Sequence, residues 1–166
     1  MWSAHAMILP YLEQKALFDA YDFDEPWDGP NNRRLAGSMP ETYRCPSESP
    51  TRPRHLTNRL VVVGAETAFP GPTGLPLSEF PREGESTLLL AEATHEAVHW
   101  MEPRVLEFDS MSFQINDRSR PSISSVHPKG PGIVCARSIT SWRWNPNASP
   151  DLVRALIVRQ SGGEVT

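Results

Sequence analysis

Proline is the residue that most restricts the fold of this chain. The sequence holds 17 prolines among 166 residues, against 10 glycines. Each proline removes one backbone N–H donor and keeps the preceding residue out of the helical region, so scattered prolines interrupt helices and favour extended connections. We therefore expect short helices and strands joined by long loops rich in proline and glycine, and no bundle of long helices.

Length and charge exclude several classes of protein. A chain of 166 residues fits the size of one domain, and we expect a single soluble domain over residues 1–166. The net charge is -4 and the charged residues of both signs are interspersed, so nucleic acid is not expected as a partner. The sequence has no apolar run of membrane-spanning length and no signal-peptide pattern, so we expect no membrane contact by these residues and no targeting signal.

Two stretches carry the apolar stripe of an amphipathic helix. The stripe over residues 12–21 predicts a helix with Pro10 in its first turn. Near the C-terminus, residues 149–151 read Ser-Pro-Asp, which supplies a capping serine, a proline in the first helical position and an acid at the positive end of the helix dipole. An apolar stripe follows over residues 152–157, and the glycines at 162–163 are expected to end this helix.

Strand signals lie between these helices. The β-branched run at residues 60–63 predicts one buried strand, whereas residues 87–92 are apolar but ambiguous between strand and helix. Residues 133–136 and 139–144 predict a hairpin joined by Arg137-Ser138, with Ile133 opposite Trp142. We expect the core side of that hairpin to hold Ile133, Cys135, Trp142 and Trp144. These signals together favour an α+β fold with a small, mostly antiparallel sheet and peripheral helices.

Residues 95–99 read His-Glu-Ala-Val-His, the pattern by which zinc peptidases hold their metal. On an α-helix, His95 and His99 would share a zinc ion and Glu96 would be the general base. The pattern arises by chance in about one chain in a hundred of this composition, and no third ligand is obvious. We therefore predict no metal and no cofactor, and keep a zinc-dependent hydrolase that uses His95, Glu96 and His99 as the alternative.

A series of short stretches along nearly the whole chain carries a family resemblance. They are residues 8–14, 22–28, 43–47, 62–64, 67–71, 83–92, 100–103, 124–128 and 154–165. In this order they resemble the planctomycete family of prepilin-like proteins, which is known as a domain of unknown function and also under a bacterial solute-binding-protein name. Family members begin with a prepilin leader and an apolar anchor helix. This chain starts partway through that pattern, so we expect it to be the C-terminal part of a longer protein.

The resemblance implies a globular domain similar to the head of a pseudopilin. It implies a non-enzymatic structural or interaction role in the envelope or in secretion, with protein partners in a pilin-like assembly. It also implies localisation in the cell envelope, or export, if the missing N-terminal leader exists. The family's other name leaves a solute-binding module as a further alternative.

The family is recognised by a C-terminal motif of His, nine residues and Asp-Gly. Here His127 and Pro128 match its beginning, but Arg137 and Ser138 stand where the family has Asp-Gly. Asp-Gly supplies the positive φ of a tight hairpin turn at low cost, and Arg-Ser does not. We therefore interpret these four residues as a folding signature. In the alternative, His127 and the acid of the motif bind a ligand or a metal together, and this chain lacks that acid.

Ser124 and Ser125 lie close to His127, which suggests a nucleophile and a base. Neighbouring side chains along a strand usually point away from each other, and the sequence places no acid to orient the histidine. We therefore predict no catalytic residue. Whether Cys45 and Cys135 form a disulfide stays open, because two cysteines permit one bridge without requiring it.

Overall fold

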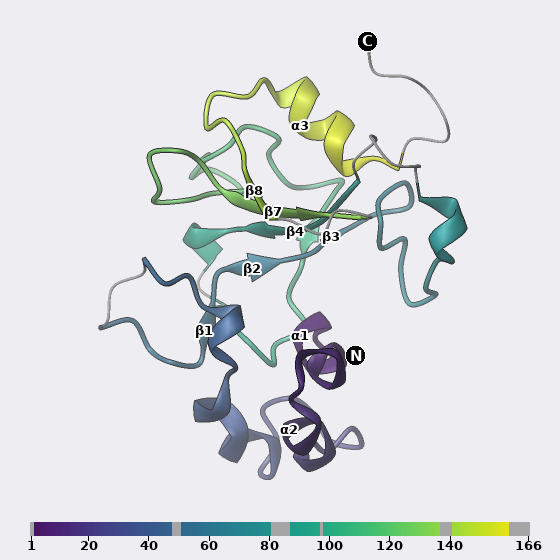
Figure 1. Ribbon diagram of the computed structural model, residues 1–166, viewed down its shortest axis with the longest axis vertical. Helices are drawn as coiled ribbons and strands as arrows, with labels where there is room; N and C mark the ends of the chain where they lie inside the picture. Colours follow the sequence, from purple (N-terminus) through teal and green to yellow (C-terminus); the bar gives the residue numbers. More distant parts are fainter. Residues whose placement is uncertain (1, 48–50, 81–86, 97, 137–140, 160–166) are drawn as a thin grey trace. The chain divides into compact units, whose positions relative to one another are not determined.

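A computed structural model describes residues 2–47, 51–80, 87–96, 98–136 and 141–159 (Figure 1). The chain divides into two compact units. Unit 1 comprises Met1–Asn58 and Ala97–Arg104, and unit 2 comprises Arg59–Glu96 and Val105–Thr166. Helices and strands occur in both units, and the fold class is α+β, as the sequence predicts. The single domain expected over residues 1–166 stays a prediction, because two compact units of one chain can unfold together or separately.

Unit 1 begins with short helices. These are α1 (Ala4–Met7) and α2 (Lys15–Ala20) with the 3-10 helices η1 (Leu9–Leu12), η2 (Asn32–Ser38) and η3 (Glu41–Tyr43). The single helix predicted over residues 12–21 is wrong, because Glu13 ends η1 in the left-handed conformation, with a φ of 60°. Pro10 lies in the first turn of η1 instead. A left-handed residue cannot continue a right-handed helix, so α2 starts afresh at Lys15.

The core of unit 1 joins these helices to a two-stranded antiparallel sheet. Strand β1 (Leu56–Thr57) pairs with β5 (Val98–His99), and Trp100 and Met101 follow β5 with fully buried side chains. The Trp100 indole N–H donates to the Ala36 carbonyl at 3.1 Å. The Ser3 hydroxyl donates to the Trp100 carbonyl at 3.0 Å. The buried core residues are Ala6, Leu9, Tyr21, Tyr43, Trp100 and Met101.

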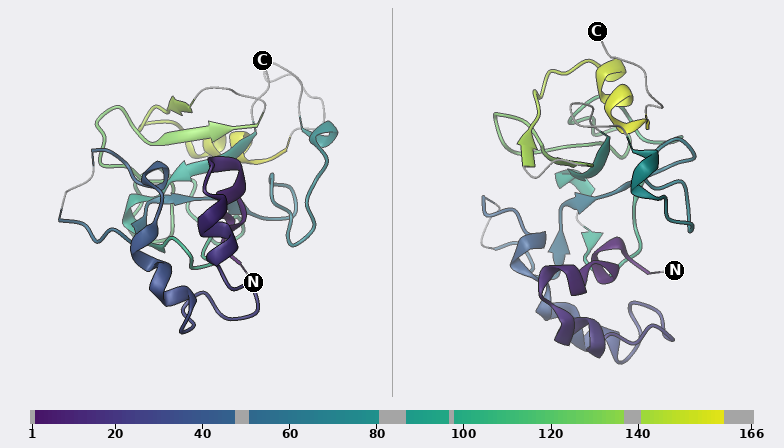
Figure 2. Two further views of the ribbon diagram at one scale, coloured as in Figure 1. Left: turned by 60° about the horizontal axis from the view of Figure 1, so that its bottom comes forward. Right: turned by 45° about the vertical axis from the view of Figure 1, so that its right-hand side comes forward.

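Unit 2 is built on a four-stranded antiparallel sheet (Figure 1). Its strands are β2 (Arg59–Leu60), β4 (Leu88–Glu92), β7 (Gly132–Cys135) and β8 (Ser141–Arg143), and they lie in the order β2-β4-β7-β8. The ambiguous stretch at residues 87–92 is therefore a strand from Leu88 onward. Helix α3 (Pro150–Ile157) packs against this sheet (Figure 2).

The register predicted for the C-terminal hairpin is confirmed. Ile133 pairs with Trp142 across β7 and β8, and Ile133 and Cys135 are buried, as expected of the core face. Trp144 is only half-buried, and the side chain of Trp142 lies outside the described residues. The predicted turn at Arg137-Ser138 lies outside them as well.

Two other predictions need correction. Residues 60–63 do not form one strand, because Leu60 belongs to β2 whereas β3 (Val62–Val63) pairs in parallel with β6 (Leu106–Glu107). Helix α3 begins as predicted, with the Ser149 hydroxyl accepting from the Leu152 N–H, but it ends at Ile157, before the glycines. It ends there because the Arg159 N–H donates to the Glu66 carbonyl at 2.7 Å instead of continuing the helix. Within the described part of the chain, no helix is long and apolar enough to cross a membrane.

Candidate functional site

Glu92 is the last residue of strand β4, and its carboxylate is buried. The Glu92 side chain is 2% exposed. Its Oε2 atom accepts hydrogen bonds from the Ser125 hydroxyl at 2.8 Å and from the Gly132 N–H at 2.9 Å. Burial of a carboxylate without partners costs several kcal/mol at least. The two donors lower that cost, and they tie β4 to the loop at Ser125 and to the start of β7.

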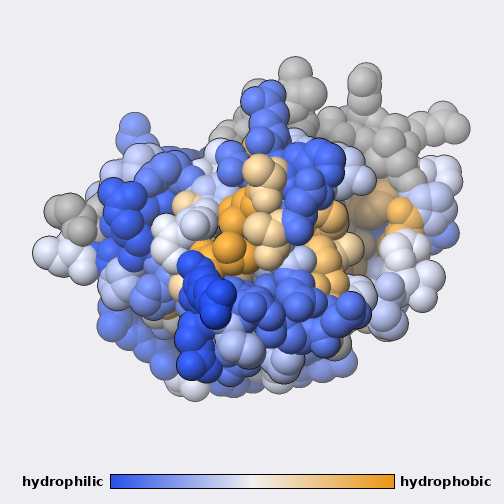
Figure 3. Space-filling view, turned by 90° about the horizontal axis from the view of Figure 1, so that it is seen from below, coloured by the Kyte–Doolittle hydropathy of each residue, from blue (hydrophilic) through white to orange (hydrophobic). Residues whose placement is uncertain are grey.

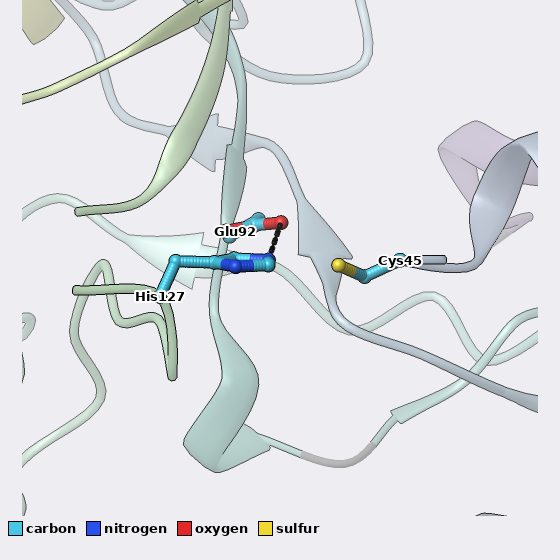
Figure 4. Close-up of side chains that lie close together, drawn as sticks. All are labelled: Cys45, Glu92 and His127. Atoms are coloured by element: carbon cyan, nitrogen blue, oxygen red, sulfur yellow. Dashed lines mark ion pairs between the residues drawn. The ribbon is translucent and has the colours of Figure 1, made fainter. Parts of the chain in front are cut away.

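His127 approaches the same carboxylate from the loop that precedes β7. Its Nε2 atom lies 3.9 Å from Oε1 of Glu92, and its side chain is 13% exposed (Figure 4). The backbone N–H of His127 donates to the Ser125 hydroxyl at 3.1 Å, so Ser125 contacts both residues. We call Glu92, Ser125 and His127 the Glu92 cluster.

Hydrogen bonds from its backbone N–H groups hold the loop that carries Ser125 and His127. The Asn116 side-chain oxygen accepts from the Ser125 N–H at 2.8 Å, and the Gly130 N–H donates to the His127 carbonyl at 2.9 Å. Gly130 has a φ of 88°, and a Cβ atom there would collide with the Trp144 carbonyl. Only glycine fits this turn, which fixes where the loop leads into β7.

The geometry of the Glu92 cluster differs from that of a nucleophile and its base. The Ser125 hydroxyl donates its hydrogen to the Glu92 carboxylate, whereas a serine activated by His127 would donate it to the imidazole. The sequence placed no acid beside His127, and the structure places Glu92 there. One signal could have found it, because Glu92 follows an apolar run, where a charged side chain is buried only when it is paired.

The residues of the zinc pattern do not share an α-helix. Thr94–Glu96 form the 3-10 turn η5 in unit 2, and His99 lies in strand β5 of unit 1, paired with Leu56. The pattern relies on one α-helix to point both histidines at one metal ion. The described residues on either side of position 97, a 3-10 turn and a strand, do not supply that helix.

His99 is instead part of an aromatic group in unit 1. Its ring lies 4.8 Å from the Trp27 ring and 5.1 Å from the His55 ring, measured between centroids. Its Nδ1 atom accepts a hydrogen bond from the Met101 N–H at 3.2 Å. Burial lowers the pKa of His99 below its ordinary value, and the nearby His55 lowers it further. Both effects favour the neutral form of the imidazole.

Exposed apolar side chains are concentrated at the start of unit 1. Trp2, Met7, Ile8 and Tyr11 are 49%, 45%, 39% and 86% exposed, while their neighbours Ala6 and Leu9 are fully buried. Figure 3 shows a face of the molecule on which apolar surface is surrounded by hydrophilic side chains. We call Trp2, Met7, Ile8 and Tyr11 the N-terminal apolar group.

A protein-family model matches residues 1–96 of the chain. The family is described as "Protein of unknown function (DUF1559)" and carries the name SBP_bac_10. The chain belongs to this DUF1559 family. No curated protein and no solved structure matched the chain.

The DUF1559 match includes Glu92 and ends at Glu96, so His127 lies beyond it. Of the four residues interpreted as the C-terminal motif, His127 is in the Glu92 cluster and Pro128 is exposed beside it. Arg137 and Ser138 lie outside the described residues, so the structure does not place them relative to His127.

This DUF1559 chain also has an open depression of about 360 Å³ in unit 2. It lies along α3 and is lined by Glu66, Asp151, Arg154, Ala155 and Val158. Small-molecule sites are usually enclosed and mostly apolar with a few polar groups. An open depression with both signs of charge at its rim offers a solute little buried surface.

Proposed function

We propose that the chain is a non-enzymatic interaction domain of the cell envelope or of a secretion assembly, similar to the head of a pseudopilin. Membership of the DUF1559 family is consistent with this role but assigns none. The observation that carries the proposal is the N-terminal apolar group. Exposed apolar patches surrounded by polar residues mark sites of interaction with other proteins. A protein partner in a pilin-like assembly would cover Met7, Ile8 and Tyr11.

Photo-crosslinking in cells of the native host tests this contact. A photoreactive phenylalanine analogue in place of Tyr11 should give discrete adducts that depend on light and that weaken in an Ile8→Ser background. Val126 is the matched control position, because it is 64% exposed but lies in unit 2, away in sequence from the apolar group. Equal adducts from both positions, or none from Tyr11, would argue against the proposed interaction surface.

The proposal includes origin and localisation. We propose that the chain is related to prepilin-like proteins of planctomycetes, and that the protein acts in the envelope or is exported. The stretches at residues 83–92 and 124–128 support this assignment by their resemblance to that family. Reading the genomic DNA upstream of Met1 tests it, since an in-frame prepilin leader is expected there. Recovery of the native protein only from the cytoplasmic fraction would contradict it.

Two structural features support a role without catalysis. Thr94–Glu96 form a 3-10 turn and Val98–His99 form a strand, in place of the α-helix of a zinc peptidase, and the Ser125 hydroxyl holds the Glu92 carboxylate. Purified protein supplied with Zn²⁺ should therefore not hydrolyse casein or short peptides above background. Hydrolysis that disappears in His99→Ala would replace this proposal by the alternative, a zinc-dependent hydrolase.

A further inference from the structure

We propose that Glu92 and His127 bind a divalent transition-metal ion such as Zn²⁺, with Oε1 of Glu92 and Nε2 of His127 as ligand atoms. Both residues belong to unit 2, on strand β4 and on the loop before β7. This inference is independent of the proposed function, because an interaction domain does not require a metal. It also differs from the zinc pattern at residues 95–99.

The separation of the two ligand atoms supports a shared ion. Oε1 and Nε2 are 3.9 Å apart, which is too long for a hydrogen bond between them. Zinc binds carboxylate oxygen and imidazole nitrogen at about 2.0–2.2 Å, so two such ligands in tetrahedral geometry lie roughly 3.4 Å apart. A closure of about half an ångström would therefore bring both atoms to coordination distance.

The surroundings of Glu92 match those of a metal-binding carboxylate. Such carboxylates are usually held by hydrogen bonds from outside the coordination shell, which fix their orientation. Here the Ser125 hydroxyl and the Gly132 N–H hold Oε2, and Oε1 is the oxygen that faces His127. The loop at residues 125–130 in turn fixes the position of the imidazole, through the bonds from His127 to Ser125 and from Gly130 to His127.

Burial adds an electrostatic reason for a cation. The Glu92 side chain is 2% exposed, and buried charges in proteins are paired with opposite charge or coordinate metals. A cation bound between the two residues would compensate the charge of the Glu92 carboxylate directly. The partly exposed His127 side chain gives the ion a path from solvent.

The donor set selects the kind of ion. One imidazole nitrogen and one carboxylate oxygen suit Zn²⁺, Co²⁺ or Ni²⁺, whereas Ca²⁺ and Mg²⁺ require shells of oxygen ligands. Two ligands leave further coordination positions for water. We therefore expect modest affinity, and binding that weakens at acidic pH because protons compete for the imidazole.

Titration of the metal-free, untagged chain with CoCl₂ tests the site, because the visible spectrum of bound Co²⁺ reports its ligands. The wild-type chain should bind one Co²⁺, which ZnCl₂ displaces and a large excess of MgCl₂ does not. His127→Ala and Glu92→Gln should each weaken binding at least tenfold. Glutamine keeps an amide oxygen that can accept from the Ser125 and Gly132 donors. The Glu92→Gln variant should therefore fold, and circular dichroism verifies this.

His95→Ala is the matched control. His95 is an exposed histidine of the same unit, and it belongs to the zinc pattern but not to the Glu92 cluster. This variant should bind Co²⁺ as the wild type does. Absence of Co²⁺ binding by the wild type would overturn the proposal, as would binding that survives in a folded His127→Ala variant. Loss of binding in His95→Ala would move the site to residues 95–99.

Discussion

The carboxylate of Glu92 accepts a 2.9 Å hydrogen bond from the backbone N–H of Gly132, so a side chain ties the end of β4 to the start of β7. The same pair of strands is already in register, with Ala91 opposite Ile133. Glu92 thus extends the contact between two strands beyond their backbone ladder. The Glu92 cluster therefore has a structural role whether or not a metal binds there.

Removal of the Glu92 side chain should destabilise the chain strongly. Glu92→Ala leaves the Ser125 hydroxyl and the Gly132 N–H without their acceptor, and we expect a loss of about 3 kcal/mol in the free energy of unfolding. Urea denaturation followed by circular dichroism measures the loss. Glu107→Ala, which removes an exposed acid from β6, should change stability by less than about 0.5 kcal/mol. Equal effects of the two substitutions would refute the structural role of Glu92.

Gly130 should tolerate no side chain. Gly130→Ala puts a Cβ atom against the Trp144 carbonyl and requires a positive φ, so we expect a loss of about 3 kcal/mol or more. Gly74→Ala is the control, because a Cβ atom at Gly74 meets open space, and its effect should stay within about 0.5 kcal/mol. Thermal unfolding of the two variants compares them. A Gly130→Ala variant as stable as the wild type would show that the turn after His127 is not required.

A better turn sequence at Arg137-Ser138 should stabilise the chain. Ile133 pairs with Trp142 in the register that a two-residue connection at Arg137-Ser138 predicts. Asp-Gly at these positions suits such a turn, so Arg137→Asp with Ser138→Gly should raise the melting temperature by about 2–4 °C. The pair Arg137→Asp with Ser138→Ala introduces the same charge without glycine and should bring no gain. An unchanged melting temperature in the Asp-Gly variant would contradict the two-residue turn.

The features that the sequence predicts correctly are those that depend on near neighbours. The capping serine and the proline at the start of α3 act within one helical turn, and the hairpin register follows from a short connection. The end of α3 differs from the prediction because the Arg159 N–H donates to the carbonyl of Glu66, which is far away in the sequence. A local sequence pattern does not predict which distant group accepts such a hydrogen bond, since any carbonyl in the chain is a candidate.

Local sequence patterns could not predict the candidate site for the same reason, because its residues are far apart in the sequence. Glu92 and His127 meet only because β4 pairs with β7 and the loop before β7 returns over the end of β4. The family resemblance singled out His127, but it gave no acid for it in this chain. The zinc pattern drew attention to His95 and His99, yet a 3-10 turn and a strand replace the helix on which that pattern depends.

The stability of the chain should fall on mild acidification because of His99. Burial, and then the neighbouring His55, lower the pKa of His99 below 6.5, although Glu102 opposes the shift. Unfolded His99 regains its ordinary pKa, so from about pH 6.5 down to the folded pKa the unfolded state binds more protons than the folded state. The free energy of unfolding therefore decreases as the pH falls through this window and is highest above it. Protonation would also break the hydrogen bond from the Met101 N–H to Nδ1.

Urea denaturation at about pH 7.5 and about pH 5.5 measures this effect. His99→Gln keeps an acceptor for the Met101 N–H but does not titrate, so it should lose less stability on acidification than the wild type. His95→Gln is the control, because His95 is exposed and should leave the pH dependence unchanged. The ring neighbours of His99 are Trp27, which does not titrate, and His55, so His55→Gln should reduce the acid loss as well. A wild-type pH dependence in His99→Gln would mean that other groups cause the acid sensitivity.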